Sequence, residues 1–382
     1  MLCCRAVSVH PERRPSIHCG STRPRCRGRS TISPGGVVTN EADRLGPTWS
    51  RRRFLGLGAA VAGSAAVLSA CGGGEAGAPA PPGSSPTAPA GSFPVTITDK
   101  FGPVTIKQPP VRVASVGRTD HDVLLALGIV PACVYRFVPA MTRGVGVWAE
   151  PKLGAANPEI ITNPISFEKV AALRPDLILD VQATGDEAEY RTLSNLAPTI
   201  GLPPNTSPNS VAWQDSTRII STAVGRKADG EKLVSDTEAV LAKIKADNPS
   251  FHGKTVSVLI GSGRQLGVYT TADTRTKLLT SLGLVPSPYV AGLGESKFFV
   301  ELSPELINDV DADIVLVLTR EGLSKADTFA QYPALAASRA AQQNRVTVVE
   351  DFNVSLALAA GSVLSIPYAV NGLVPMLKSK FG

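Results

Sequence analysis

One segment of this chain constrains its architecture more than any other. Residues 228–248 form an uninterrupted amphipathic run that ends at Asn248-Pro249, a typical helix stop. Its apolar side chains recur on one helical face: Leu233, Val234, Val240, Leu241 and Ile244. A helix of this length spans roughly 31 Å, about the width of a small domain. The sequence therefore predicts one rigid connecting helix, residues 228–249, between two parts of the chain.

On both sides of this helix, short β-rich runs alternate with helical ones. Before it, the β-rich runs are residues 111–116, 130–135, 176–181 and 198–201, and the helical ones are 120–127, 167–173, 187–196 and 211–224. After it, the alternation continues through residues 255–260, 277–282, 313–318 and 346–350, and one last helical segment covers 354–377. An entry hairpin is expected at residues 95–97 and 104–106. This order predicts an α/β protein, with two Rossmann-like lobes built on open sheets at residues 93–227 and 250–382.

A weak internal repeat supports two similar lobes. Ser166-Phe-Glu168 and Ser303-Pro-Glu305 each precede a short helical stretch, and an Asp followed by an apolar strand comes at identical spacing, at Asp176 and Asp313. Two copies of one supersecondary unit on either side of a long helix indicate related halves, although chance matching of capping residues can mimic this pattern.

The positive charge of the chain is concentrated at its N-terminus. Residues 1–71 contain 11 Lys and Arg against 3 Asp and Glu, which leaves 27 against 29 for the remainder. The formal net charge of +6 therefore does not describe the body, and a nucleic-acid partner is not expected. Only Cys133 of the six cysteines lies beyond residue 71, so no disulfide is expected within the body.

Residues 50–71 have the pattern of an export signal, with Arg51, Arg52 and Arg53 before a short apolar stretch. Ser-Arg-Arg-x-Phe-Leu resembles a twin-arginine signal, with Gly56 where a Lys is common. Leu-Ser-Ala-Cys-Gly resembles a bacterial lipobox, which implies lipidation at Cys71 and anchoring on the extracytoplasmic face of the cell membrane.

The segments around this signal are expected to lie outside the fold. Residues 1–49 precede a complete signal, and a non-ATG start at Val37 or Val38 would leave part of them untranslated. Cys3, Cys4, Cys19 and Cys26 match no zinc-ligand spacing. Residues 72–92 contain five prolines and no aliphatic residue larger than Ala, which is typical of a disordered tether.

The body lacks the sequence motifs of common enzyme classes. It has no P-loop, no His-Glu-x-x-His and no Gly-x-Ser-x-Gly. Gly261-Ser-Gly263 follows a strand, but its spacing and the strand-like Val268-Tyr269-Thr270 do not fit a dinucleotide fold. Only His121 and His252 lie in the body, too few for a three-histidine metal cage. These features favour a binding protein over an enzyme, without catalytic residues, cofactor or resident metal.

From Thr96 onward the chain resembles the helical-backbone (class III) substrate-binding proteins of ABC importers, in the branch that carries ferric siderophores. The matching stretches are Ile97-Thr-Asp-x-x-Gly102-x-Val104, Pro110-x-Arg112-Val113, Asp120–Gly128, Lys152-Leu-Gly154, Leu173-x-Pro-Asp-Leu-Ile-Leu179, Leu196-Ala-Pro-Thr199, Trp213-Gln214, Arg275-Thr-x-Leu-Leu-Thr-Ser-Leu-Gly283 and Ala312-Asp313. The resemblance implies two lobes joined by one rigid helix, and a ferric siderophore held in the cleft between them. A cobalamin or haem carrier of the same fold is the alternative, and a surface scaffold or an enzyme that reuses the fold is a more distant one.

In open α/β sheets, ligands bind beyond the carboxyl ends of the strands. The candidate ligand-binding residues at these predicted ends are Arg118, Tyr135, Arg136, Trp148, Arg264, Tyr269, Phe298 and Arg320. A ferric siderophore is a bulky oxygen chelate whose iron is already saturated, so the protein needs cations and flat apolar surfaces rather than metal ligands.

Several of these residues have an equally good structural interpretation. Arg136 and Arg264 fit solvated loop cations, and Trp148 and Trp213 fit core anchors. Arg275 begins a helix, where a structural bond is expected. Arg118 occupies a position where members of the family often carry an aromatic residue.

The resemblance also implies delivery to an ABC permease. It implies that Glu168 and Glu305, one in each repeat, dock into basic pockets of two permease subunits, which work with an ATPase. The alternative is that each carboxylate only complements a positive helix N-terminus. The protein is expected to be a monomer that closes only modestly on its ligand, with Gly230 as the one potential hinge in the connecting helix.

Overall fold

The computed structural model describes residues 93–381 with the exception of Glu321. The expected signal, lipidation site and tether lie outside this range. Within it, the chain begins with an antiparallel hairpin of β1 (Val95–Asp99) and β2 (Gly102–Ile106). The Asp99 carboxylate accepts the backbone N–H groups of Phe101 and Gly102 in the turn, and that of Gly201 from the neighbouring sheet. The expected hairpin is therefore present and is fixed to the first lobe.

The first sheet has five parallel strands in the order β5-β4-β3-β6-β7. Its strands are β3 (Val113–Ser115), β4 (Cys133–Tyr135), β5 (Glu159–Ile161), β6 (Leu177–Leu179) and β7 (Thr199–Ile200). The helices between and after them are α1 (Asp120–Ala126), α2 (Glu150–Leu153), α3 (Phe167–Ala172), α4 (Glu187–Ser194) and α5 (Trp213–Ala223). From β3 the chain continues to β4 and β5 on one side of β3, and it then returns to β6 and β7 on the other side. The connections after β3 and β6 therefore run in opposite directions, and this arrangement opens a crevice at the carboxyl ends of these two strands.

The predicted connecting helix is α6, Lys227–Asp247. It packs against α5, and the two helices approach closely at Gly230, where a Cβ atom would lie 1.9 Å from Ser221 Oγ. Gly230 is buried at this contact, where the absence of a side chain lets the two helices approach closely.

The second sheet is mixed and follows the order β11-β9-β8-β12-β13, with β10 paired to the start of β8. Its strands are β8 (Thr255–Ser262), β9 (Gln265–Tyr269), β10 (Val285–Pro286), β11 (Phe299–Leu302), β12 (Ile314–Leu318) and β13 (Val346–Val349). The helical segments around it are η1 (Pro249–Phe251), α7 (Thr274–Ser281), α8 (Pro288–Gly292), η2 (Pro304–Leu306), α9 (Lys325–Gln331), α10 (Pro333–Ala336) and α11 (Arg339–Gln342). The predicted α/β fold with two sheets is confirmed.

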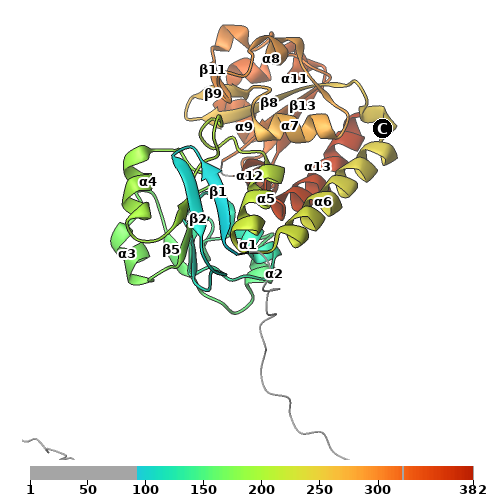
Figure 1. Ribbon diagram of the computed structural model, residues 1–382. Helices are drawn as coiled ribbons and strands as arrows, with labels where there is room; N and C mark the ends of the chain where they lie inside the picture. The colour runs from blue at the N-terminus through green and yellow to red at the C-terminus, as the bar shows by residue number, and fades with distance from the viewer. Residues whose placement is uncertain (1–92, 321, 382) are drawn as a thin grey trace, which may run out of the picture. The chain divides into compact units, whose positions relative to one another are not determined.

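The expected single C-terminal helix is wrong in one respect, because the segment forms two helices. They are α12 (Phe352–Ala360) and α13 (Ser365–Phe381), and Gly361 ends α12 in the left-handed conformation. The break lets α13 turn back along α6 (Figure 1). One apolar core contains residues of both lobes, among them Leu125, Trp148, Leu279 and Leu373. The lobes are thus held together by packed side chains as well as by α6.

The internal repeat corresponds to equivalent contacts in the two lobes. Asp176 accepts hydrogen bonds from the backbone N–H groups of Val111 and Arg112, just before β3. Asp313 accepts hydrogen bonds from both the backbone N–H and the side-chain hydroxyl of Thr255, at the start of β8. In both sheets the strand after the Asp pairs with this first strand. The helical stretches differ, since Ser166 caps α3 whereas Ser303 precedes only a single 3₁₀ turn.

In the part of the chain that the structure describes, no helix combines the length and the apolarity needed to cross a membrane.

Candidate ligand-binding cleft

A cavity of about 830 Å³ lies where the two lobes face each other. The first lobe contributes Arg118, which follows β3, and residues 137–140, which follow β4. The second lobe and α12 contribute Ile260, Tyr269, Arg275, Leu318, Thr319, Arg320, Phe352, Ser355, Leu356 and Ala359. The cavity therefore lies at the carboxyl ends of β3, β4, β8 and β12, where an open α/β sheet binds its ligand.

Arg118 is fixed from several directions. Its backbone N–H donates to the Gln182 carbonyl at 2.9 Å, which joins the loops after β3 and β6. Its guanidinium lies over the Phe137 ring at 4.6 Å, and Nη2 donates to the Ala359 carbonyl at 3.2 Å. The ring and the carbonyl orient the cation without neutralising it, so its positive charge remains available in the cavity.

Arg275 is the corresponding cation of the second lobe. Asp273 caps α7 by accepting the Arg275 backbone N–H, and its other oxygen accepts from Nη1 at 2.8 Å. The Arg275 guanidinium lies over the Tyr269 ring at 4.1 Å, and only 8% of the residue is exposed. Nε has no hydrogen-bond partner among the described residues.

The two arginines influence each other electrostatically. Burial, followed by repulsion from Arg275, lowers the pKa of Arg118 to about 10, so Arg118 remains charged at neutral pH. Asp273 offsets part of this charge. An anion placed between the two guanidinium groups would remove the repulsion. The cavity is therefore suited to an oxygen-rich, negatively charged ligand.

A smaller side pocket of about 170 Å³ adjoins this cavity and shares Arg118 and Phe137 with it. It is lined by polar residues of the first lobe: Tyr135, Asn163, Asp180, Gln182, Glu189 and Asn209. Burial raises the pKa values of Tyr135 and Glu189. The site thus has a cationic main cavity and an acidic side pocket.

Four of the eight residues expected at the ligand lie in this site. Arg118, Tyr269 and Arg320 line the main cavity, and Tyr135 lines the side pocket. Arg320 is exposed, and its Nε donates to the Gly261 carbonyl at 3.2 Å.

The other four expected residues lie elsewhere. Arg136 lines a separate hollow with Asn157, Thr162 and Lys169. Trp148 is a core residue that is 9% exposed, and its indole N–H donates to Asp122 at 2.8 Å. Phe298 is 50% exposed and lines none of these cavities.

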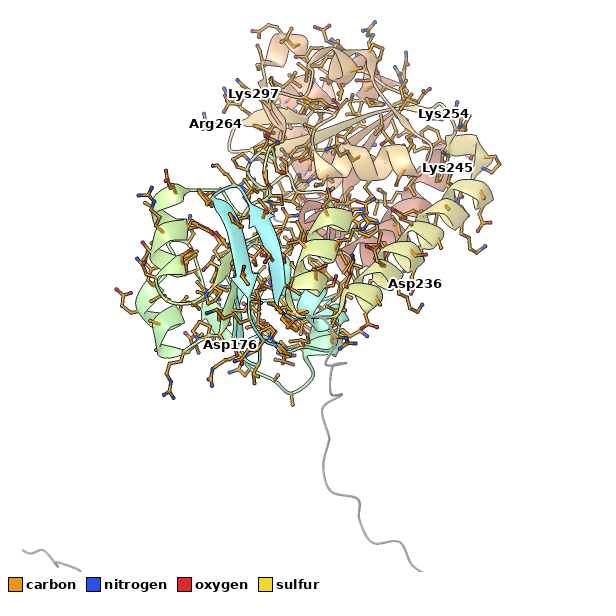
Figure 2. All side chains as sticks on the ribbon, in the orientation of Figure 1. Asp176, Asp236, Lys245, Lys254, Arg264 and Lys297 are labelled. Atoms are coloured by element: carbon orange, nitrogen blue, oxygen red, sulfur yellow. The ribbon has the colours of Figure 1, made fainter. Side chains whose placement is uncertain are left out.

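Arg264 lies at the β8–β9 turn, at the margin of the second lobe (Figure 2). It lines a small hollow with Leu302 and Pro304, away from both the main cavity and the side pocket.

Three of the aromatic and charged residues that line the main cavity were not expected from the sequence. Phe137 follows the strand end where only Tyr135 and Arg136 were considered. Arg275 was assigned a structural bond, and the structure shows that it also lines the cavity. Phe352 begins α12 and lines the cavity together with other residues of that helix. The pairing of each arginine with an aromatic ring could have identified these residues only after the ends of the strands were known, because the partners are distant in the sequence.

Glu168 and Glu305 are both exposed, and each accepts a hydrogen bond from the serine two residues before it. This bond from Ser303 lowers the pKa of Glu305. Glu168 lies in the first turn of α3, which comes after β5, and Glu305 follows β11, which runs in the same direction as β8. Both therefore lie on the strand-end side of their sheets, the side that carries the cavity.

Among the described residues no group of three or more His, Cys, Asp and Glu is arranged to hold a metal ion. A chelate would have to be recognised through its outer oxygen atoms by arginine and aromatic groups. Two α/β lobes around a cavity of this kind define a two-lobed ligand-binding protein.

The chain belongs to the periplasmic binding protein family, whose model matches residues 113–351. It is 30% identical to a periplasmic solute binding protein from Mycobacterium smegmatis str. MC2 155, with a TM-score of 0.66 over 75% of this chain and 99% of that one. It is 29% identical to PiaA of Streptococcus pneumoniae TIGR4 in a complex with ferrichrome, with a TM-score of 0.64 over 75% and 98%.

Among curated proteins, it is 28% identical over 221 residues to the probable siderophore-binding lipoprotein YfiY of Bacillus subtilis, which covers 55% of this chain and 64% of that protein. The resemblance found in the sequence is confirmed at the level of the family. Membership in this family makes the protein a binding protein rather than an enzyme.

Proposed function

We propose that this protein captures a ferric siderophore in the cavity between its lobes and delivers it to an ABC permease. The observation that carries the proposal is the pair of arginines, half-buried Arg118 and buried Arg275, which line one cavity from opposite lobes. Each guanidinium lies over an aromatic ring, which fixes its direction. A chelate with several peripheral oxygens can accept from both arginines at once, whereas a neutral apolar ligand would leave the charge of Arg118 uncompensated and Nε of Arg275 without an acceptor.

The names of the relatives support the same class of ligand. PiaA was crystallised with ferrichrome, and YfiY is named as siderophore-binding. A cavity of about 830 Å³ is large enough for a ligand of that kind, and the rings of Phe137, Tyr269 and Phe352 offer flat apolar surface beside the cations. We propose a single binding site, occupied by one chelate per monomer.

Calorimetric titration of the purified chain tests this proposal. The panel contains a ferric trihydroxamate, a ferric tricatecholate, ferric citrate, haem, cobalamin and each chelator without iron. We expect saturable binding of at least one ferric chelate, and we expect Arg118→Gln and Arg275→Gln each to weaken it by tenfold or more, since a buried charged hydrogen bond contributes about 1.5–3 kcal/mol.

Arg136→Gln is the matched control, because it removes the same charge outside the cavity and should leave the affinity unchanged. Binding of haem or cobalamin alone would replace the proposed ligand with one of those. Equal affinity in all three variants would place the ligand away from the two arginines.

We further propose that Glu168 and Glu305 dock on the two permease subunits. Both are exposed on the strand-end side of their lobes, and neither lines the cavity. Exposed ion pairs are individually weak, so the two contacts act mainly by orienting the protein. The double variant Glu168→Ala, Glu305→Ala should keep its ligand affinity within about twofold and lose uptake in cells. Persistent uptake at normal surface abundance would leave only helix capping for these glutamates.

Anchoring at Cys71 is a separate part of the proposal, supported by the lipobox pattern and by the description of YfiY as a lipoprotein. Two or three acyl chains on one residue are enough for stable attachment, whereas a single chain is marginal. A Cys71→Ala variant should appear in the medium or the soluble fraction rather than with the membrane. Membrane association of that variant at normal levels would exclude lipidation as the anchor.

A further inference from the structure

Binding of an anionic chelate does not explain the acidic side pocket, because such a ligand needs cations around it rather than carboxylates. Its volume of about 170 Å³ is a fraction of the main cavity's 830 Å³, so it has room for an arm of a ligand and not for a chelated metal centre. It adjoins the main cavity at Arg118 and Phe137, which line both. A ligand in the main cavity can therefore extend an arm into it.

Asp180 is the residue that distinguishes this pocket. It is the first residue after β6, beside the crevice where the chain runs from β3 and β6 in opposite directions, and it is 4% exposed. Its backbone N–H donates to the Ile200 carbonyl, but its carboxylate makes no hydrogen bond or ion pair with any residue in the described range 93–381, Glu321 left aside. A buried carboxylate without a partner is costly, so its position in a ligand pocket calls for an explanation.

The neighbouring carboxylates are already occupied. Asp120 accepts the N–H groups of Val181 and Gln182, and Asp99 accepts that of Gly201. Glu189, which is half-buried, lines the same pocket as Asp180. Burial together with Asp120, Glu189 and Asp99 raises the pKa of Asp180 well above its usual range. The pocket therefore gathers acidic groups, and the ionised form of Asp180 lacks a cation among the described residues that would stabilise it.

The nearby cations do not neutralise this charge. Arg118 points its guanidinium at Phe137 and the Ala359 carbonyl, and Lys100 Nζ donates to the Gly185 carbonyl. Gln182 Nε2 donates to the Val211 carbonyl at 2.9 Å, which leaves its oxygen as an acceptor. Tyr135, Asn163 and Asn209 can donate only as neutral groups, and no cation acts on the Asp180 carboxyl in the described part of the chain. What the pocket lacks is a donor that carries positive charge.

From this geometry we infer that the side pocket receives a protonated primary amine on an arm of the ligand, held by Asp180 with Glu189 as its second anion. This inference rests on the proposed function, because the arm belongs to the chelate bound between Arg118 and Arg275. An ammonium group has three donors and no acceptor, which matches a pocket that offers two carboxylates and the Gln182 oxygen. The ligand is then a chelate with negatively charged oxygens at one end and a cationic arm at the other.

Matched pairs of ferric chelates test the inference on the full chain. One pair is a linear trihydroxamate with a free terminal amine and the same molecule with that amine acetylated; the other is a tricatecholate with a free and an acetylated alkylamine arm. In the wild type we expect the free amine to bind at least tenfold more tightly in one of the pairs. In Asp180→Asn this preference should fall to within about twofold, because the affinity for the acetylated form stays the same and that for the amine drops.

Two further variants make the result specific. Glu189→Gln should reduce the preference partially, since Asp180 remains. Asp236→Asn removes the same charge from the exposed face of α6, where Figure 2 labels Asp236, and should preserve the preference in full. Thermal melting of each variant confirms folding, and Asp180→Asn is not expected to melt earlier because it removes an unpaired buried charge.

The outcomes separate this inference from the proposed function. Equal affinity of the wild type for both members of each pair, or a full preference retained in Asp180→Asn, overturns the amine subsite while the chelate site stands. If no ferric chelate binds, both the proposed function and the subsite fall.

Discussion

At the scale of single residues, His121 links stability to pH. It is 1% exposed in α1, its Nε2 lies 3.5 Å from Asp122 Oδ1, and its Nδ1 has no partner in the described part of the chain. Burial lowers its pKa, and Asp122 only partly offsets this. The unfolded chain therefore binds a proton near pH 6.5 that the folded chain accepts only at lower pH. The stabilisation that comes from burying neutral His121 is therefore complete above pH 6.5, and it is lost as the pH falls below this value.

We expect His121→Met to remove this dependence. The unfolding free energy of the wild type, relative to this variant, should drop by about 1 kcal/mol between pH 7 and pH 5.5, because a pKa difference is worth about 1.4 kcal/mol per unit. Urea unfolding at a series of pH values measures it. The comparison must be made at equal pH, since burial raises the pKa of Asp120 to about 6 with the opposite effect in both proteins. His252→Gln, at an exposed position, is the control, and a gap that does not change with pH would contradict the account.

Residue identity alone could predict only part of the site. Arg118 and Tyr269 were found because the ends of parallel strands meet at one edge. Trp148 satisfies the same sequence criterion but lies in the core, since Asp122 supplies the acceptor that its indole N–H needs. Whether a tryptophan next to a strand end faces a cavity or an internal carboxylate depends on the fold, so the sequence could not separate the two.

At the scale of the elements, the contact between α5 and α6 sets how the connecting helix leaves the first lobe. A Cβ at Gly230 would lie 1.9 Å from Ser221 Oγ and 2.4 Å from Ser221 Cβ. Gly230→Ala should destabilise the protein by about 1–3 kcal/mol through overpacking, despite a helix-propensity gain of about 1 kcal/mol. Denaturant unfolding measures the change.

A second substitution separates packing from hinge motion. In a Ser221→Gly background the Cβ of an alanine at position 230 has room, so Gly230→Ala should no longer destabilise the protein. A double-mutant cycle of the two substitutions should therefore show strong coupling in the unfolding free energy. Gly292→Ala in α8, where a Cβ would meet nothing within 4 Å, is the control and should be neutral or stabilising. If Gly230→Ala were harmless to stability but changed ligand affinity, Gly230 would be a hinge instead.

Periodicity predicted the regular elements well and their interruptions badly. The 21-residue helix and the strands at residues 255–260 and 313–318 have strong, uninterrupted patterns, and α6, β8 and β12 follow them. The break at Gly361 was missed because apolar residues continue on both sides of it. β5 and β11 were also missed.

At the scale of the whole molecule, the lobes share a core that limits their relative motion. Leu125 and Trp148 of the first lobe pack in the same cluster as Leu279 and Leu373, and Asp122 accepts a hydrogen bond from Ser362. Rotation of one lobe would break these contacts as well as bend α6. We expect saturation with ligand to change the radius of gyration by less than about 1 Å, as small shifts of packed elements do. Solution scattering of the free and saturated protein measures this, and a change of several ångströms would show hinge closure.

The central claim is that a ferric chelate lies between Arg118 and Arg275. Crystals of the protein grown with the chelate that binds most tightly, measured on both sides of the iron absorption edge, locate the metal directly. The account predicts one anomalous iron peak inside the cavity lined by Arg118, Tyr269 and Arg275, with no protein atom in its coordination shell. An iron peak outside this cavity, or one ligated by protein side chains, would contradict it.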